Sequence, residues 1–198
     1  MNLDKTFETF SAKCPFAVLT QIIMRGLLRD DLNQVFEENR SQQYEREVSF
    51  ADLAMAVADV TLGFSENFNQ AYRALKEELG VSRQSFYDKV NATELAISSG
   101  VVSKSAERAV EMQEALGFVP WEVLAGYRVF SVDGNHLQES EKRLKALRDC
   151  HDAPLAGIAV ARLDHQRLLF DRAYLLEDAH AQECSIQDLI VDDLEPND

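Results

Sequence analysis

The chain has 198 residues, 46% of them hydrophobic, which is enough for one large domain or two small ones with a buried core. Its 20 lysines and arginines stand against 34 acidic residues, giving a formal net charge of −14. Proteins that bind nucleic acid by themselves usually have a basic footprint, so this balance excludes DNA binding over the whole surface and leaves only local patches.

The cysteines and the N-terminal segment point to a cytoplasmic protein. Cys14, Cys150 and Cys184 are odd in number and far apart, which suits neither a disulfide framework nor a zinc site. Residues 1–13 are polar, and no apolar run approaches the roughly 20 residues that span a bilayer. We therefore expect no signal peptide and no membrane partner.

Helical patterns occupy the first 117 residues. Apolar residues recur every three or four positions over residues 17–38, which predicts a helix with a possible interruption near Gly26. Ser49, with Asp52 after it, predicts the start of a central helix, and Asn67 predicts the start of another that Gly80 ends. A short helix should run from residue 82 to 90, and a last one from residue 103 or 105 to about 116, ended by a glycine.

After Pro120 the pattern becomes that of strands. Residues 127–133 form a β-type run that Gly134 should end, with residues 129–133 as an internal strand. Further runs cover residues 157–163 and 167–176, and their link is too short for a crossover, so the three strands should form an antiparallel meander. Residues 183–194 read as a helix. The expected fold class is α+β, with a helical domain over residues 1–125 and a β-rich part over 126–198.

A family resemblance rests on this β-rich part. Ser131-Val-Asp-Gly-Asn-His-Leu137, followed by Glu141-Lys-Arg-Leu-Lys145 and Leu147-Arg148, resembles the segment around the first catalytic Asp of insertion-sequence type 4 transposases, which are DDE-type enzymes. Asp178-Ala-His-Ala-Gln-Glu183 resembles the link between the third strand and the first helix of their RNase H-like domain. The resemblance covers residues 128–198 well and the helical part loosely.

This resemblance implies an incomplete RNase H-like part with three antiparallel strands and a helix, and Asp133 as catalytic residue and metal ligand. The family uses three carboxylates with two Mg²⁺ ions, roughly 3.5 to 4 Å apart, to cut and join DNA. Neither the second Asp nor the Glu has a match among the 198 residues, which implies a truncated or split transposase that is inactive alone. From the residues alone, Asp133-Gly134 is equally a turn after a strand.

Two segments are candidates for contact with DNA. One is the dense basic cluster just after Asp133, whose members would meet phosphates or, alternatively, form a solvated face: Lys142, Arg143, Lys145 and Arg148. The other, residues 75–90, resembles a helix-turn-helix, with Phe86 and Val90 in the core. Its second helix offers four side chains to a major groove: Arg83, Gln84, Tyr87 and Lys89. The acidic residues around it favour an ordinary helical corner instead.

Three functions follow from these observations. The first is part of a DDE transposase that binds transposon ends, with the remainder of a split transposase or another copy of itself as partner. The second is a non-catalytic DNA-binding or interaction fragment, and the third is a helix-turn-helix-like regulator, which leaves residues 128–198 unexplained. The four histidines form no ligand-spaced cluster, and none lies near a Ser or Cys in a nucleophile motif.

Overall fold

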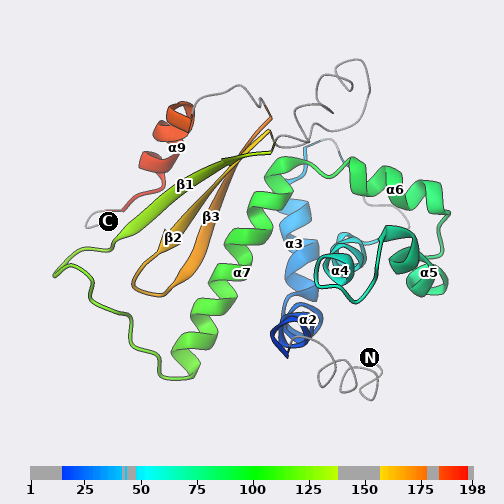
Figure 1. Cartoon of the computed structure of the whole chain (residues 1–198), viewed down its shortest axis with the longest axis horizontal. Helices are drawn as coiled ribbons and strands as arrows, with labels where there is room; N and C mark the ends of the chain where they lie inside the picture. Colours follow the sequence, from blue (N-terminus) through cyan, green and yellow to red (C-terminus); the bar gives the residue numbers. More distant parts are fainter. Residues whose placement is uncertain (1–14, 42, 44–47, 138–156, 178–182, 196–198) are drawn as a thin grey trace. The chain divides into compact units, whose positions relative to one another are not determined.

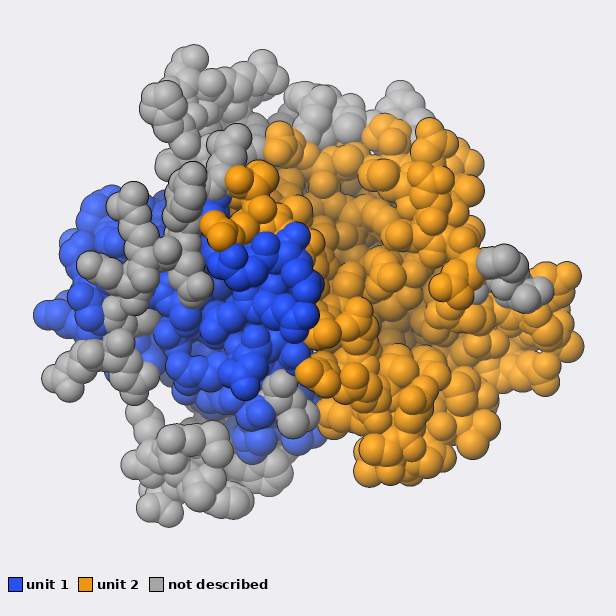
Figure 2. Space-filling model, turned by 180° about the vertical axis from the view of Figure 1, so that it is seen from behind, with its two compact units in different colours: residues 1–38, 42–91 blue, residues 39–41, 92–198 orange. Residues whose placement is uncertain are grey.

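The computed structural model describes residues 15–41, 43, 48–137, 157–177 and 183–195 (Figure 1). Its contacts divide the chain into two compact units, residues 1–38 with 42–91, and residues 39–41 with 92–198 (Figure 2). The first unit is helical, and the second combines one long helix with a three-stranded antiparallel sheet. The expected α+β class is confirmed. The units separate near residue 91 rather than at residue 125, because the long helix packs against the sheet.

The helical unit is built around α4 (Phe50–Thr61), which contacts four other helices. These are α2 (Pro15–Leu27), α3 (Arg29–Asn39), α5 (Phe68–Leu79) and α6 (Arg83–Asn91). A break at residue 28 separates α2 from α3. The predicted interruption of the first helix is thus confirmed. The central position expected of α4 follows from its composition, since it is apolar on most sides and buries seven of its side chains.

Predicted caps set the ends of these helices. The Ser49 hydroxyl accepts a hydrogen bond from the Asp52 backbone N–H at 3.1 Å and donates one to its carboxylate at 2.7 Å. The Asn67 side chain accepts from the Gln70 N–H, and Gly80 ends α5 with a φ of +63°. Because only glycine adopts that conformation without steric penalty, local sequence decides where α5 stops.

The long helix α7 (Leu95–Ala115) starts about eight residues earlier than predicted and stops where predicted, before Gly117 at φ +73°. Residues 98–103 are Ser-Ser-Gly-Val-Val-Ser, a poor helix-forming run. Packing against the sheet overrides this weak local preference, with Ile97 fully buried and Ala106 7% exposed. Neither α7 nor any other helix in the described residues is long and apolar enough to cross a membrane.

The sheet has the order β1-β2-β3 and is antiparallel throughout, which confirms the predicted meander. Its strands are β1 (Phe130–His136), β2 (Ile158–Asp164) and β3 (Leu169–Leu176). The prediction that Gly134 ends the first strand is wrong, because Gly134 pairs with Val160 and the pairing continues to His136. Among the described strands β1 lies at an edge, not inside the sheet as expected.

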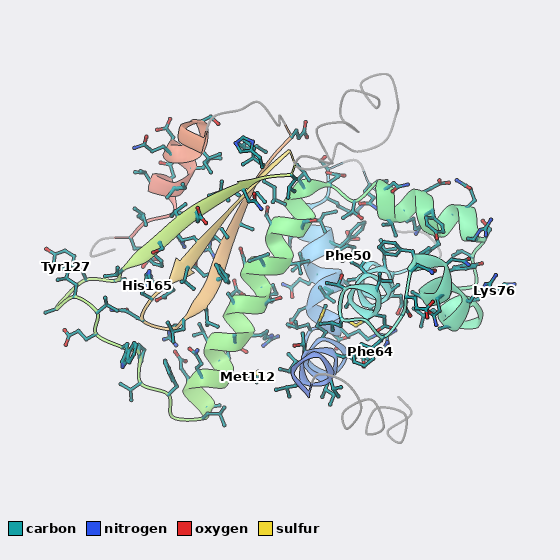
Figure 3. All side chains as sticks on the ribbon, viewed as in Figure 1. Phe50, Phe64, Lys76, Met112, Tyr127 and His165 are labelled. Atoms are coloured by element: carbon teal, nitrogen blue, oxygen red, sulfur yellow. The ribbon has the colours of Figure 1, made fainter. Side chains whose placement is uncertain are left out.

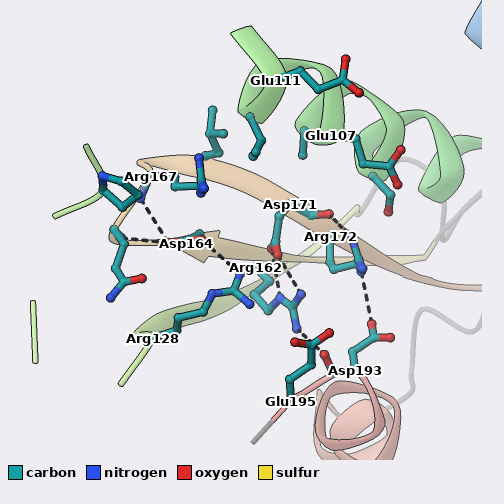
Figure 4. Close-up of a pocket in the computed structure, with 16 residues that line it drawn as sticks. Glu107, Glu111, Arg128, Arg162, Asp164, Arg167, Asp171, Arg172, Asp193 and Glu195 are labelled. Atoms are coloured by element: carbon teal, nitrogen blue, oxygen red, sulfur yellow. Dashed lines mark hydrogen bonds and ion pairs between the residues drawn. The ribbon is translucent and has the colours of Figure 1, made fainter. Parts of the chain in front are cut away.

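A small core holds the C-terminal helices against one face of the sheet. Ile158 and Val160 of β2 pack with Ile186, the last residue of the short 3₁₀ helix η1 (Glu183–Ile186). Tyr174 and Ile190 lie at the border of this cluster, and Ile190 belongs to α9 (Gln187–Asp192). The predicted helix over residues 183–194 is therefore a 3₁₀ turn followed by one short α-helix. Figure 4 shows α7 and α9 on opposite sides of the strands.

Candidate functional site

Asp133 lies in the middle of β1, opposite Ala161 of β2, and is exposed. Because side chains alternate along a strand, Ser131 and Asn135 share its face, and both are exposed as well. No described strand lies along the other edge of β1. The backbone thus fixes an exposed carboxylate on a regular strand, which lies at the edge of the sheet among the described strands.

The described residues do not complete a metal site around Asp133. In this part of the chain, no group of three or more His, Cys, Asp or Glu is placed to hold a metal ion. The nearby strand carboxylate of Asp164 is 3% exposed and accepts from the backbone N–H groups of Gln166 and Arg167 at 2.8 and 3.1 Å. It lies three positions from Ala161 on β2, so it points to the opposite face from Asp133.

Ser131 meets His165 at the end of the sheet, a pairing that the sequence did not suggest. The Ser131 Oγ and the His165 Nε2 are 2.5 Å apart, although the residues are 34 positions apart in the chain. Figure 3 shows His165 at the turn that joins β2 to β3. The His165 backbone N–H also donates to the Val129 carbonyl oxygen at 3.0 Å. Both contacts tie the β2–β3 turn to β1, and this positioning role accounts for the pair.

The predicted helix-turn-helix segment forms a tight corner between α5 and α6. The Tyr72 hydroxyl donates to the Val81 carbonyl oxygen in the turn at 2.8 Å, and the rings of Tyr72 and Phe86 lie 5.6 Å apart. Phe86 is fully buried and Val90 is half-buried. The Ser82 hydroxyl accepts the Ser85 backbone N–H at the start of α6. The core position assigned to Phe86 from the sequence is confirmed, whereas Val90 lies at the border of the core.

The four proposed groove-reading side chains of α6 differ in accessibility. Arg83 and Gln84 are exposed in its first turn, although the Gln84 amide donates to the Asp88 carboxylate at 2.7 Å. Tyr87 is half-buried with its ring edge-on to Phe86. Lys89 donates to the Val48 carbonyl oxygen at 3.1 Å. The first turn of α6 is thus better placed for contact with a ligand than its last.

The basic cluster of Lys142, Arg143, Lys145 and Arg148 lies outside the described residues.

An ionic cluster around the buried Arg162, at the C-terminal end of α9, was not predicted. The Arg162 side chain is 3% exposed and donates to both carboxylate oxygens of Asp171, at 3.0 and 2.7 Å (Figure 4). It also lies over the Phe130 ring, 4.5 Å from its centroid. Arg172 and the Tyr174 hydroxyl reach the Asp193 carboxylate at 3.6 and 2.9 Å. These contacts join the sheet to the end of α9, beside a cavity of about 570 Å³.

The cluster shifts the pKa values of two of its members. Burial acts to lower the pKa of Arg162, but the hydrogen bond and charge of Asp171 outweigh it and raise that pKa. Burial raises the pKa of Tyr174 to about 12, and the hydrogen bond that its hydroxyl donates to Asp193 adds to this effect. Each arginine lining the cavity faces a carboxylate, so the cluster serves to hold the sheet and α9 together.

The Tyr174 shift predicts a loss of stability at alkaline pH. The pKa of Tyr174 is about 12 in the folded protein and 10.0 for a free tyrosine. The protonated phenol therefore contributes its full stability below pH 10.0, and this contribution is lost as the pH rises to about 12. At pH 11 we expect the wild type to have lost about 1 kcal/mol more than a Tyr174→Phe variant, relative to pH 8, after allowance for partial exposure. Urea unfolding of both proteins at the two pH values measures this difference, and equal losses would refute it.

Comparisons of the chain with models of known families, with curated proteins and with solved structures found no match. The resemblance to insertion-sequence type 4 transposases therefore rests on the residues around Asp133 alone.

Proposed function

We propose that this chain is part of a DDE-type transposase of the insertion-sequence type 4 group, in which Asp133 contributes the first catalytic carboxylate for cutting and joining DNA. The observation that carries the proposal is the exposed position of Asp133 in the middle of an edge strand, within the segment that resembles the family. A carboxylate fixed on a strand and open to solvent suits a site shared between a protein and a phosphate backbone.

The arrangement of the sheet supports an RNase H-like domain. Three antiparallel strands in the order β1-β2-β3, followed by a short helix, match the start of that fold as the resemblance describes it. A fourth strand beside the open edge of β1 would place Asp133 inside a larger sheet. The second Asp and the Glu have no match among the 198 residues, so we propose that polypeptide outside this sequence supplies them and completes the Mg²⁺ site.

Contact with DNA is assigned to local patches, since the net charge of −14 repels a phosphate backbone elsewhere. Arg83 and Gln84, exposed in the first turn of α6, are of the types that read base edges in a major groove. The cluster of Lys142, Arg143, Lys145 and Arg148 would meet phosphates near Asp133. Transposon ends are the DNA partner that this arrangement implies.

The α5–α6 corner favours one alternative, a non-catalytic DNA-binding or interaction fragment. A left-handed glycine in the turn, a buried Phe86 and an exposed start of the second helix are also what a helix-turn-helix regulator needs. Such a protein would use the helical unit alone. The β-rich unit with Asp133 then has no role, which is why we prefer the transposase.

Reading the nucleotides after codon 198 tests the choice. If the transposase assignment is correct, they encode, in one of the three frames, an apolar strand that ends in Asp and later a helix that carries a Glu. Absence of both from every frame would leave Asp133 without partners and would favour the non-catalytic fragment.

A further inference from the structure

An ordered but exposed apolar surface lies at the end of the sheet where α7 connects to β1. We call residues 116–127, with Leu168 and Phe170 of the β2–β3 hairpin, the apolar platform. Its most exposed large side chains are Leu116 at 83%, Val119 at 79%, Trp121 at 69% and Leu168 at 62%. Large apolar side chains that stay exposed in this number along one short segment and the hairpin bonded to it favour a site of association.

Hydrogen bonds hold the platform in place rather than folding it inward. The Trp121 backbone N–H donates to the Gln166 carbonyl oxygen at 2.9 Å, and the Gln166 side chain donates to the Tyr127 carbonyl oxygen at 3.0 Å. The Gln113 side chain donates to the Arg167 carbonyl oxygen at 2.9 Å. Figure 1 shows this connection passing the β2–β3 hairpin. A surface ordered before binding loses little conformational entropy when a partner covers it.

The backbone conformation of Leu168 also favours a partner on the apolar platform. It is the one non-glycine residue of the described chain with a positive φ, at +54°, a conformation that Gly and Asn adopt more readily. Its side chain gains no compensating burial, since it is 62% exposed. Folding of the hairpin alone therefore gives no reason for a leucine here, whereas burial by a partner does.

Charge identifies the partner. Residues 116–127 contain a single charged side chain, Glu122, on a chain of net charge −14. The flanking Arg128 and Arg167 are paired with Asp164 and Glu114, at 3.2 and 3.0 Å. Nucleic acid or an anionic membrane would be repelled by the chain and would meet only neutralised arginines here. A basic protein would be attracted to the acidic remainder of the surface instead.

We propose that a second copy of this chain docks on the apolar platform, with the two platforms facing each other about a two-fold axis. An uncharged patch is where two acidic copies can meet with least repulsion, and a two-fold contact needs only self-complementarity. The exposed area of the platform side chains, on the order of 800 Å² per copy, matches one side of a standard interface. This inference stands independently of the transposase assignment.

The single tryptophan makes the docking directly measurable, because Trp121 is the only one in the chain and lies within the platform. Sedimentation equilibrium and tryptophan emission should be followed together over a range of protein concentrations. We expect a dimer whose formation moves the emission to shorter wavelength as Trp121 leaves water. Raising the salt concentration should strengthen the dimer, since it screens the repulsion between two copies of charge −14.

Leu168→Asn is the decisive variant, with Leu189→Asn in α9, 54% exposed, as the matched control. Asn suits the left-handed turn, so the variant should unfold at no lower urea concentration than the wild type, yet bind its second copy about tenfold more weakly or worse. The control should dimerise like the wild type. A monomer at every concentration, or a dimer unaffected by Leu168→Asn, would overturn the proposal. So would a monomer whose Trp121 emission responds to anionic vesicles or to single-stranded DNA.

Discussion

Replacing Arg162 by Ala is expected to lower the free energy of unfolding of the sheet unit by about 3 to 5 kcal/mol. The guanidinium is 3% exposed and is the partner of both carboxylate oxygens of Asp171, so its removal leaves a carboxylate in a half-buried place without its counter-charge. It also removes the contact with the Phe130 ring. Urea unfolding followed by far-UV circular dichroism measures the loss.

An exposed pair provides the control. Arg108 and Glu111 lie 2.6 Å apart on α7 with side chains 38% and 61% exposed, and Arg108→Ala should change stability by only about 0.5 kcal/mol. The double variant Arg162→Met with Asp171→Leu should recover most of the lost stability, since neither charge is then left unpaired. A loss below about 1 kcal/mol in Arg162→Ala would show that the ionic cluster does not hold the sheet unit together.

Local signals made most helix ends predictable. Ser49, Asn67 and Gly80 act through hydrogen bonds and backbone angles within four residues, so their effect can be read without knowledge of the fold. The start of α7 could not be read in this way. Its serines, glycine and valines favour no helix by themselves, and the contact with β3 that stabilises it joins segments more than 50 residues apart.

The sequence predicted that the strands exist more accurately than it predicted the residues at which they end. Alternation and a short link identified the meander, but the end of β1 depended on β2, which continues to pair beyond Asp133 as far as His136. Glycine weakens a strand without ending it when a neighbouring strand supplies the hydrogen bonds. Thus the sequence alone predicts that Asp133 lies in a strand. Its place along that strand could not be predicted, because it depends on pairing with β2.

The residues singled out from the sequence divide in the same way. Asp133 was proposed from its flanking residues, and Phe86 was assigned to the core from its helical spacing. The Arg162–Asp171 pair had no signal, because a charged residue in a strand run is normally assigned to the solvent face, and the irregular pairing next to Arg162 was not visible in the sequence. The exposure of Trp121 was equally hidden, since composition cannot distinguish an apolar loop that packs from one that does not.

Replacing Asp133 by Asn should abolish catalysis without unfolding the protein. In an assembly that contains the two further carboxylates, we expect the rate of DNA cleavage to fall about a thousandfold or more, because a lost metal ligand removes several kcal/mol of transition-state stabilisation. Since Asp133 is exposed, the free energy of unfolding of the protein should change by only about 0.5 kcal/mol in this variant. Asp188→Asn, an exposed acid in the first turn of α9, should leave the cleavage rate unchanged.

Cleavage of end-labelled transposon-end DNA in Mg²⁺ or Mn²⁺ tests the role of Asp133 most directly. On the proposed function the chain alone should not cut, because only one of the family's three carboxylates has a match among the 198 residues. The chain combined with a polypeptide that supplies the two further carboxylates should cut, and Asp133→Asn should remove that activity. Undiminished cutting by the combined Asp133→Asn protein would contradict the catalytic assignment, and metal-dependent cutting by the chain alone would contradict the need for carboxylates from outside it.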